Sequence, residues 1–356
     1  MKKVGQRCVF SLAVFGATVI GVALAVSTAQ AEDPPFYKGK QIRLIIASDV
    51  AGGYDTYGRL FARHISKFIP GHPTVVVTNM DGGGGVMAAN YLSHVAPKDG
   101  TTLVMMQNNM PQAKILGLQG VDFDPTQLNW LGSLNSEVSV CVAWHTSPVK
   151  TIEDAKTTEL IVGGSGQNNT EQLPAVFNNL IGTKFKIISG YPGGAGILLA
   201  MERGEVEGRC GWSWSSVVVQ RPQWLKDKKI NVLAQVALKK HPDLPHVPLV
   251  YDLAKTEEDK QALDFLFARL SMGRPIAAPP GMPPERVALL RKAFDEMVAD
   301  KEVQADFENQ KQELTQMSGK EVQALVERLN KFPPDVKVRA DAATEYRGVR
   351  IRAGGQ

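Results

Sequence analysis

Three glycine-rich stretches contain the residue types that can hold a small anion. Gly52-Gly53 follow a short apolar run, four glycines occupy positions 82–85, and a third stretch ends in Gly193-Gly194. Each stretch lies between an expected strand and an expected helix, where glycine lets the backbone turn without a side-chain clash. Unpaired N–H groups at the start of a helix, together with the positive end of its dipole, attract an anion. The spacing therefore predicts capture of a small carboxylate, with no chemistry performed on it.

A polar loop at residues 163–170 adds uncharged hydrogen-bonding side chains. Its sequence is GGSGQNNT, and groups of this kind fix the orientation of a ligand and give specificity. The predicted ligand-binding residues are Gly52, Gly53, Tyr54, Asp55, Gly83, Gly84, Asn108, Ser165, Gln167, Asn168, Thr170, Tyr191, Gly193, Gly194 and Arg209.

Two charged residues in this set have alternative structural roles. Asp55 is either a helix N-cap or a ligand contact. Arg209 begins an expected strand at 209–214 and could form a bidentate pair with a ligand carboxylate. The alternative for Arg209 is a surface salt bridge with Glu205 or Glu207.

The polar loop also comes close to a nucleophile elbow. Residues 163–167 match G-x-S-x-G except at the last position, which is Gln167. An exported α/β hydrolase with His241 or His246 as its base is therefore a rival hypothesis. Because the elbow is incomplete and no triad acid stands out, we expect a binding protein and not an enzyme.

Nucleotide and metal sites are not expected. Residues 83–88 fit only the looser G-x-G-x-x-A pattern, no acidic residue follows at the ribose-binding distance, and the chain contains no G-x-x-x-x-G-K-[ST]. Cys141 and His145 are too few for zinc, which takes about four ligands. We predict no cofactor and no metal.

The N-terminus has the composition of a secretory signal peptide. Lys2, Lys3 and Arg7 precede an apolar run at 9–26, and an A-x-A cleavage site ends at Ala31. A single membrane anchor is the alternative, but the cleavage site and the polar residues after it favour export. We predict a periplasmic protein cleaved after Ala31.

The expected mature chain is large and nearly neutral. Removing residues 1–31 from the 356 leaves 325, and it removes three positive and no negative charges, so the formal net charge falls from +4 to +1. This balance predicts no nucleic-acid partner, and the length predicts two lobes rather than one core. Cys141 and Cys210 either form a disulfide, which an oxidising compartment permits, or remain buried thiols.

Strand–loop–helix units repeat along the chain and position these loops. Their alternation favours a parallel α/β sheet with its loops at the carboxyl ends of the strands. Proline-spaced runs at 241–248 and 275–284 look like connectors. Periodicity predicts strands at 42–46, 73–78, 101–106, 138–144, 160–162, 185–188, 209–214 and 230–238. It predicts helices at 55–68, 86–95, 151–156, 170–180, 197–203, 286–309 and 319–332.

Taken in order, these pieces resemble the Bug-type receptors of tripartite tricarboxylate transporters. No single motif is specific, but their order covers most of residues 37–330. The matching stretches are YKGK at 37–40, AGGYD at 51–55 with Arg59, NMDGGGG at 79–85, APKDG at 96–100, GSG at 164–166, YPGG at 191–194, RGEVEG at 203–208, LPHVP at 244–248 and APPGMP at 278–283.

The resemblance implies an α/β, two-lobed type II periplasmic-binding-protein fold with the ligand in the cleft between the lobes. Lobe 1 would take residues 36–132 and 246–356, and lobe 2 residues 133–245. The implied function is delivery of a small carboxylate to the integral-membrane subunits of a transporter, and presentation of the liganded receptor to a sensor kinase is the alternative. We also predict a monomer.

One departure from the family pattern concerns the first loop. Ser48-Asp49 replace the Pro-Phe that is common before it, and an inward-pointing Asp49 or Asp55 would repel a carboxylate. The identity of the ligand is therefore open.

Overall fold

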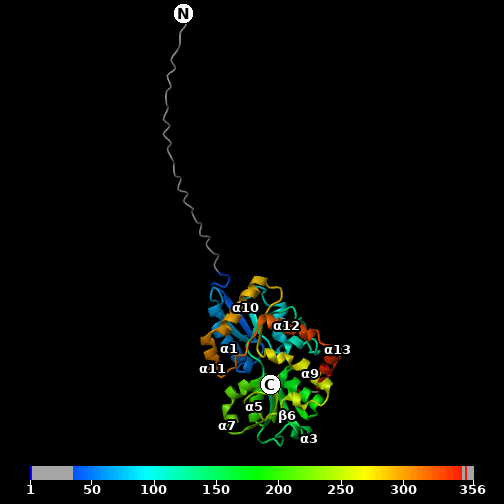
Figure 1. Ribbon diagram of the computed structural model, residues 1–356. Coiled ribbons are helices and arrows are strands. Elements are labelled where there is room, and N and C mark those ends of the chain that lie inside the picture. The colour runs from blue at the N-terminus through cyan, green and yellow to red at the C-terminus, as the bar shows by residue number, and fades with distance from the viewer. Residues whose placement is uncertain (2–34, 347–348, 351–356) are drawn as a thin grey trace, which may run out of the picture. The chain divides into compact units, whose positions relative to one another are not determined.

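The computed structural model describes Met1 and residues 35–346 and 349–350. The described residues from Pro35 onward form one compact unit, which contains two six-stranded sheets and the helices packed against them (Figure 1). Apart from Met1, the expected signal peptide and its cleavage site lie outside the described residues. Within the described part of the chain, no helix combines the length and apolar character needed to cross a membrane.

The first sheet carries the loops that contain Gly52-Gly53, the four glycines at 82–85, and Asn108. Its strands are β1 (Gln41–Ile46), β2 (Thr74–Asn79), β3 (Thr102–Met105), β4 (Asn129–Ser133), β10 (Pro275–Ala278) and β11 (Met317–Ser318). Their order is β11-β4-β10-β3-β1-β2. β1 pairs in parallel with β2 and β3, whereas β10 is antiparallel to β3 and β4, and β11 is antiparallel to β4.

The second sheet carries the polar loop at 165–170 and the loop that contains Gly193-Gly194. Its strands are β5 (Ser139–Trp144), β6 (Leu160–Gly164), β7 (Phe185–Ser189), β8 (Gly208–Ser213), β9 (Ile230–Val236) and β12 (Val349–Arg350). Their order is β12-β7-β6-β8-β5-β9. β6 is parallel to β7 and β8, and β12 is parallel to β7, whereas β5 is antiparallel to β8 and β9.

The prediction of a parallel sheet was therefore only partly right, because both sheets are mixed. The reason is that the chain crosses between the sheets twice. β4 leaves the first sheet and β10 returns to it, so these two neighbours run in opposite directions. β5 enters the second sheet and β9 leaves it, so they are antiparallel as well.

Helices connect most of the strands. Those of the first part of the chain are α1 (Gly53–Ile65), α2 (Val86–His94), α3 (Asp154–Thr157), α4 (Asn169–Val176), α5 (Gly194–Glu202), α6 (Trp214–Gln220) and α7 (Pro222–Lys226). Those of the second part are α8 (Val250–Leu253), α9 (Glu257–Phe267), α10 (Pro284–Ala299), α11 (Lys301–Asn309), α12 (Gly319–Asn330) and α13 (Pro334–Thr344). A π-helical turn, Phe177–Ile181, extends α4.

The predicted strands and helices are present, with three corrections. The proline run at 275–284 was expected to be a connector, but its first four residues form β10. Trp214 was expected on a strand, but it begins α6. The helix expected at 286–309 is two helices, because Asp300 accepts the main-chain N–H groups of Glu302 and Val303 and caps the second one.

The two cysteines form a disulfide. Cys141 on β5 and Cys210 on β8 are both buried, and their Cα atoms lie 3.9 Å apart across neighbouring strands. The structure thus selects the disulfide over the pair of buried thiols. The bond ties the strand that enters the second sheet to the strand that carries Arg209.

Helix α1 is fixed by the apolar face that its sequence predicts. Leu60 and Phe61 are buried, and the ring of Phe61 lies 6.5 Å from that of Phe294 on α10. This packing holds the N-terminus of α1 at the end of β1, where the first glycine loop lies.

Two crossings connect the sheets and lie side by side. Residues 134–138 lead from β4 to β5, and residues 237–274 lead from β9 back to β10. Three main-chain hydrogen bonds join them: Leu134 N–H to Arg274 O at 3.2 Å, Gly273 N–H to Asn135 O at 2.7 Å, and Glu137 N–H to Leu270 O at 2.6 Å. The two crossings therefore form one narrow, paired connection.

Candidate ligand-binding site

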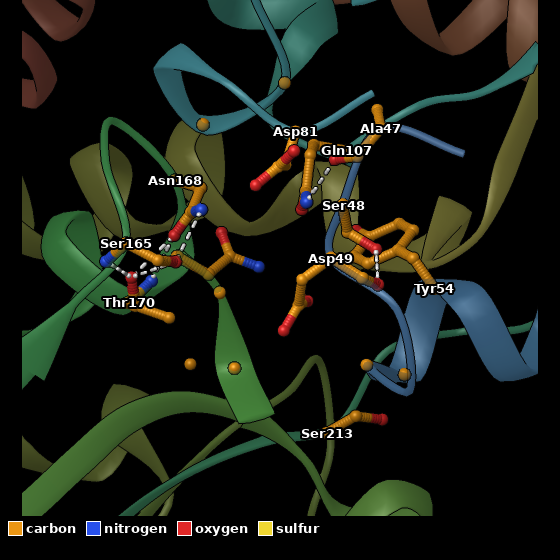
Figure 2. A pocket seen from close by; sticks show the side chains of 18 of the residues that line it. Ala47, Ser48, Asp49, Tyr54, Asp81, Gln107, Ser165, Asn168, Thr170 and Ser213 are labelled. Atoms are coloured by element: carbon orange, nitrogen blue, oxygen red, sulfur yellow. Dashed lines mark hydrogen bonds between the residues drawn. The ribbon is translucent and has the colours of Figure 1, made fainter. Parts of the chain in front are cut away.

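A cavity of about 80 Å³ lies where the loops of the two sheets meet. At about 10–15 Å³ for each water position, it has room for roughly five to eight waters, which suits a small ligand. The predicted site residues that line it are Gly52, Gly53, Tyr54, Gly84, Ser165, Asn168, Thr170, Gly193, Gly194 and Arg209. Figure 2 shows the polar side chains that surround the space.

Four helices of eight or more residues begin at this cavity, as does the shorter α6, whose N-cap is Ser213. The N-cap residues of the four longer helices all line it, and these are Gly52 for α1, Gly85 for α2, Asn168 for α4 and Gly193 for α5. Each helix start offers main-chain N–H groups and the positive end of a dipole. The groups of the cavity that can bind an anion are therefore these main-chain N–H groups together with Arg209 and Arg274, and the lining contains no lysine. The same lining contains the carboxylates of Asp49, Asp81 and Glu137.

Gly53 allows the two sheets' loops to approach each other. A Cβ atom at this position would lie 2.5 Å from the Oγ atom of Ser216 on α6 and 3.3 Å from Nη2 of Arg274. Any larger side chain at residue 53 would occupy the same space as these groups. Because Gly53 has no side chain, the first loop can approach Ser216 and Arg274 closely, and the cavity between them still has room for a ligand.

Asp55 is not an N-cap, because Gly52 holds that position. It is 3% exposed and accepts hydrogen bonds from Ala51 N–H, Arg59 Nε and Asn79 Nδ2, each at 2.9 Å. Burial acts to raise the pKa of the Asp55 carboxyl, but these hydrogen bonds outweigh it and hold the pKa below its usual value. Asp55 does not line the cavity, and it stabilises the loop from behind.

Tyr54 connects the first loop to the loop after β3. Its hydroxyl accepts a hydrogen bond from Asn108 N–H at 3.0 Å, and burial raises its pKa to about 12. Asn108 lies behind the cavity wall, where its Oδ1 accepts from Nδ2 of Asn169 at 3.1 Å. Asn108 therefore positions lining residues of both sheets without lining the cavity itself.

The polar loop before α4 is held by its own side chains. Asn168 Oδ1 accepts from the Thr170 hydroxyl at 2.7 Å, and Ser165 N–H donates to that hydroxyl at 2.9 Å (Figure 2). Asn168 Nδ2 donates to the Ser165 hydroxyl at 3.2 Å. These three side chains face the cavity as one fixed group.

Three predicted site residues lie elsewhere. Gly83, Gln167 and Tyr191 line an adjoining cavity of about 1490 Å³ and not the smaller one. Gln167 also bonds with the main chain of Gln119, through an N–H···Oε1 bond of 2.7 Å. Neighbours in sequence thus face two different cavities.

Arg209 is buried at the cavity wall and is 8% exposed. Its Nη1 donates to Gly194 O at 3.1 Å, and within the described residues its Nε has no hydrogen-bond partner. Burial lowers the pKa of Arg209 to about 10, and the charges of Asp49 and Glu137 oppose that fall. The guanidinium remains a cation at neutral pH, and it forms no salt bridge with Glu205 or Glu207, which bond to Arg203 and Ile161 N–H.

The sequence reading missed a buried ion pair at the base of the cavity. Arg274 and Glu137, one on each crossing, form a salt bridge with side chains only 2% and 3% exposed. The Arg274 guanidinium also lies 4.4 Å from the centre of the Tyr54 ring. Both charged residues line the cavity. Nothing in the local sequence marks them, because their partners come from distant positions.

Other lining residues were not among the predicted ligand-binding residues, although they border the predicted loops and Asp49 had been considered as an inward-pointing charge. They are Ala47, Ser48, Asp49, Asp81, Gly82, Gly85, Gln107, Asn169, Pro192, Gly211, Trp212, Ser213 and Ser216. Their position directly after a strand was the available signal for Ala47, Ser48 and Asp49. Gln107 Nε2, for example, donates to Ala47 O at 2.9 Å and closes the wall between two strand ends.

The hydroxyl of Ser165 lacks the partner that a nucleophile needs. It bonds with Thr170 and Asn168, and in the described part of the chain no histidine reaches it. His241 instead pairs with Glu313 at 3.0 Å. The described residues also contain no group of three or more His, Cys, Asp or Glu side chains placed to hold a metal ion.

Comparison with protein families gives a match over most of the chain. The model of the "Tripartite tricarboxylate transporter family receptor" family matches residues 59–334. A comparison with curated proteins finds no match.

Solved structures share the fold at low sequence identity. BugD, described as a periplasmic binding protein, has 18% identity and a TM-score of 0.68, and the match covers 87% of this chain and 99% of BugD. An R. palustris protein solved with adipate has 20% identity and a TM-score of 0.67, covering 85% of this chain and 97% of the other. MatC from Rhodopseudomonas palustris, solved with malate, has 18% identity and a TM-score of 0.66, covering 85% and 99%. The shared architecture is that of two-lobed periplasmic binding proteins.

Proposed function

Because the chain belongs to the receptor family of tripartite tricarboxylate transporters, we propose that it binds a small carboxylate in the cavity of about 80 Å³ and delivers it to the membrane subunits of such a transporter. Receptors of this family are periplasmic solute-binding proteins and not enzymes. Transfer to a transporter is favoured over signalling to a sensor kinase because the family is defined by the transporter.

The observation that carries this proposal is the convergence of four helix N-termini on one cavity. Main-chain N–H groups aimed at one point can hold an anion without a buried lysine. Arg209 adds a full positive charge at the same wall. Two structures with this fold were solved with adipate and with malate, which are carboxylates.

The absence of catalysis is part of the proposal. A hydrolase would need a base for Ser165, and the Ser165 hydroxyl is instead bonded to Thr170 and Asn168. We also propose that the receptor acts as a monomer, since residues from the two sheets of a single chain suffice to line the cavity.

The proposed lobe division follows the sheets. Lobe 1 takes 36–132 and 246–356, and lobe 2 takes 133–245, so the paired crossings lie at the boundary. Two places depart from this rule. Ser133, the last residue of β4 in the first sheet, falls in lobe 2, and β12 at 349–350 pairs with β7 of the second sheet.

A thermal-shift experiment tests carboxylate binding. The mature protein is screened against small carboxylates and, as matched controls, their primary amides, which have nearly the same size and no charge. At about one hundred times its dissociation constant, a bound carboxylate should stabilise the fold by about 2.7 kcal/mol. With an unfolding entropy of about 2.1 cal/mol/K per residue, that is a melting shift of about 4 °C. Equal shifts with the amides, or none with any carboxylate, would contradict the proposal.

Export is a separate expectation. We propose cleavage after Ala31, since the charged start, the apolar run and the A-x-A site form a signal peptide. The intact mass of protein from the periplasmic fraction should correspond to a chain that begins at Glu32. A chain that retains Met1 and sediments with membranes would show a membrane anchor instead.

A further inference from the structure

Asp49 reaches from the first sheet's loop across the cavity. It lies three residues after the end of β1, and its Oδ2 accepts the N–H of Ala195 at 3.1 Å. Ala195 is the second residue of α5, which belongs to the other side of the cavity. Figure 2 shows the Asp49 side chain extending from its loop into the cavity. One carboxylate of the protein thus sits at one of the four converging helix starts.

The start of α5 is shaped for that carboxylate. A Cβ on Gly193 would overlap the Asp49 carboxyl group, so only glycine leaves the space free. A Cβ on Gly194 would lie 2.6 Å from Nη2 of Arg209, which places a cationic group beside the same helix start. Arg209 is more than nine-tenths buried, and among the described residues its Nε lacks a partner. The α5 start therefore has the donors of an anion site, and the chain's own anion is in it.

The charge of Asp49 depends on these contacts. Burial raises the pKa of Asp49, while the N–H group of Ala195 and the charge of Arg209 oppose that rise. A ligand carboxylate placed at α5 would either displace Asp49 from these groups or lie beside it as a like charge. Both arrangements disfavour a second anion at this end of the cavity.

We propose that Asp49 occupies the anion position at α5 in place of a ligand carboxylate, so that this receptor selects a monocarboxylate with a neutral or cationic far end and discriminates against dicarboxylates. The inference rests on the proposed function. It leaves the main-chain N–H groups of the other helix starts for the single ligand carboxylate, and Asp49 Oδ1 also borders Gly52, the N-cap of α1. It also explains how a cavity that contains Asp49 can still serve a carboxylate receptor.

Calorimetry with matched probes tests the selection. The probes are monocarboxylates, ω-amino carboxylates and dicarboxylates of three to six carbons, titrated into the mature wild-type protein and the Asp49→Asn variant. Asparagine keeps the size of the side chain and removes its charge. The wild type should bind a monocarboxylate or amino carboxylate at least tenfold more tightly than the dicarboxylate of equal length. The Asp49→Asn variant should shift that ratio at least tenfold toward the dicarboxylate.

The outcomes separate the two proposals. Binding of a dicarboxylate by the wild type at least as tightly as its matched monocarboxylate would overturn the role of Asp49 and leave the receptor function intact. An unchanged ratio in the Asp49→Asn variant would do the same. If no carboxylate binds to either protein, the proposed function fails together with the inference.

Asp81→Asn is the matched control. Asp81 is a second carboxylate of the same cavity, and in the described part of the chain it makes no hydrogen bond to α5. If the effect were only net charge, both variants would shift the ratio equally, which would overturn the specific role of Asp49.

A ligand-free measurement checks the contact itself. The NMR signal of the Ala195 amide should follow the titration of Asp49 in the wild type and in Asp81→Asn, and it should lose that response in Asp49→Asn. A wild-type Ala195 amide that does not respond to pH would show that Asp49 is not at α5.

Discussion

Replacing Gly53 by Val is expected to lower carboxylate affinity at least hundredfold, which corresponds to about 2.8 kcal/mol. Gly53 is the first residue of α1, and the space for its missing side chain is taken by Ser216 and Arg274. A valine there would block the approach of a ligand to the α1 N–H groups and keep the two walls apart. The stabilisation by ligand in a thermal-shift experiment should disappear. The melting temperature without ligand should fall as well, because the valine crowds Ser216 and the buried Arg274, so calorimetry measures the affinity directly.

A smaller substitution distinguishes two reasons for a loss of affinity. The new side chain can exclude the ligand from the α1 N–H groups, or it can push the first loop away from Ser216. In Gly53→Ala, the new Cβ meets the Ser216 Oγ at 2.5 Å but the Ser216 Cβ only at 3.7 Å. Adding Ser216→Ala removes the close atom and should restore most of the affinity lost by Gly53→Ala. Ser216→Ala alone measures any direct role of that hydroxyl. If Gly53→Val retains full affinity, the first loop is not the anion site.

Breaking the Arg274–Glu137 pair is expected to have the largest effect on stability without ligand. In Arg274→Met, the Glu137 carboxylate stays buried on the other crossing without its partner. Removing one partner of a buried ion pair typically costs about 3–5 kcal/mol. The midpoint of urea unfolding of the unliganded protein measures this loss.

Two controls interpret that loss. The double variant Arg274→Met, Glu137→Gln removes the uncompensated charge and should recover about half of the lost stability, because the penalty comes from an unpaired buried carboxylate. Lys292→Met breaks an exposed pair with Glu296, 3.7 Å long, and should cost less than about 1 kcal/mol. If Arg274→Met and Lys292→Met were equally mild, the paired crossings would not depend on this interaction.

Local sequence signals were sufficient for the glycine loops and for most strands. Gly52 and Gly193 precede amphipathic or small-residue helices, and short-range patterns reveal such junctions. The same signals misplaced the cap of α1, since Gly52 with its extended backbone takes the position expected for Asp55. A short polar residue near a helix start can cap the helix from the N-cap position, or it can lie inside the first turn and accept an N–H group from the preceding loop, as Asp55 does from Ala51.

Side-chain direction in the loops was not predictable. Gln167 and Asn168 are neighbours, yet one faces the cavity of about 1490 Å³ and the other the cavity of about 80 Å³. Irregular backbone has no fixed period, so sequence order does not give the facing of each residue. Only the surrounding contacts, such as the bond between Gln119 and Gln167, decide it.

Long-range pairing was the other missing element. Glu137 and Arg274 are separated by most of the second sheet, and no pattern within a single element reveals such a pair. Pro275 made the strand after Arg274 look like a connector. Proline is accepted as the first residue of a strand, where its missing N–H group has little consequence.

The position of Arg274 has a consequence for how a transporter could tell a loaded receptor from an empty one. The same guanidinium lines the cavity and holds the two crossings together. A ligand anion in the cavity would attract the Arg274 guanidinium and so compete directly with Glu137, its partner on the other crossing. No intermediate side chain is needed to transmit this effect. The part of the molecule that detects cargo and the part about which it would bend are then separated by a single side chain.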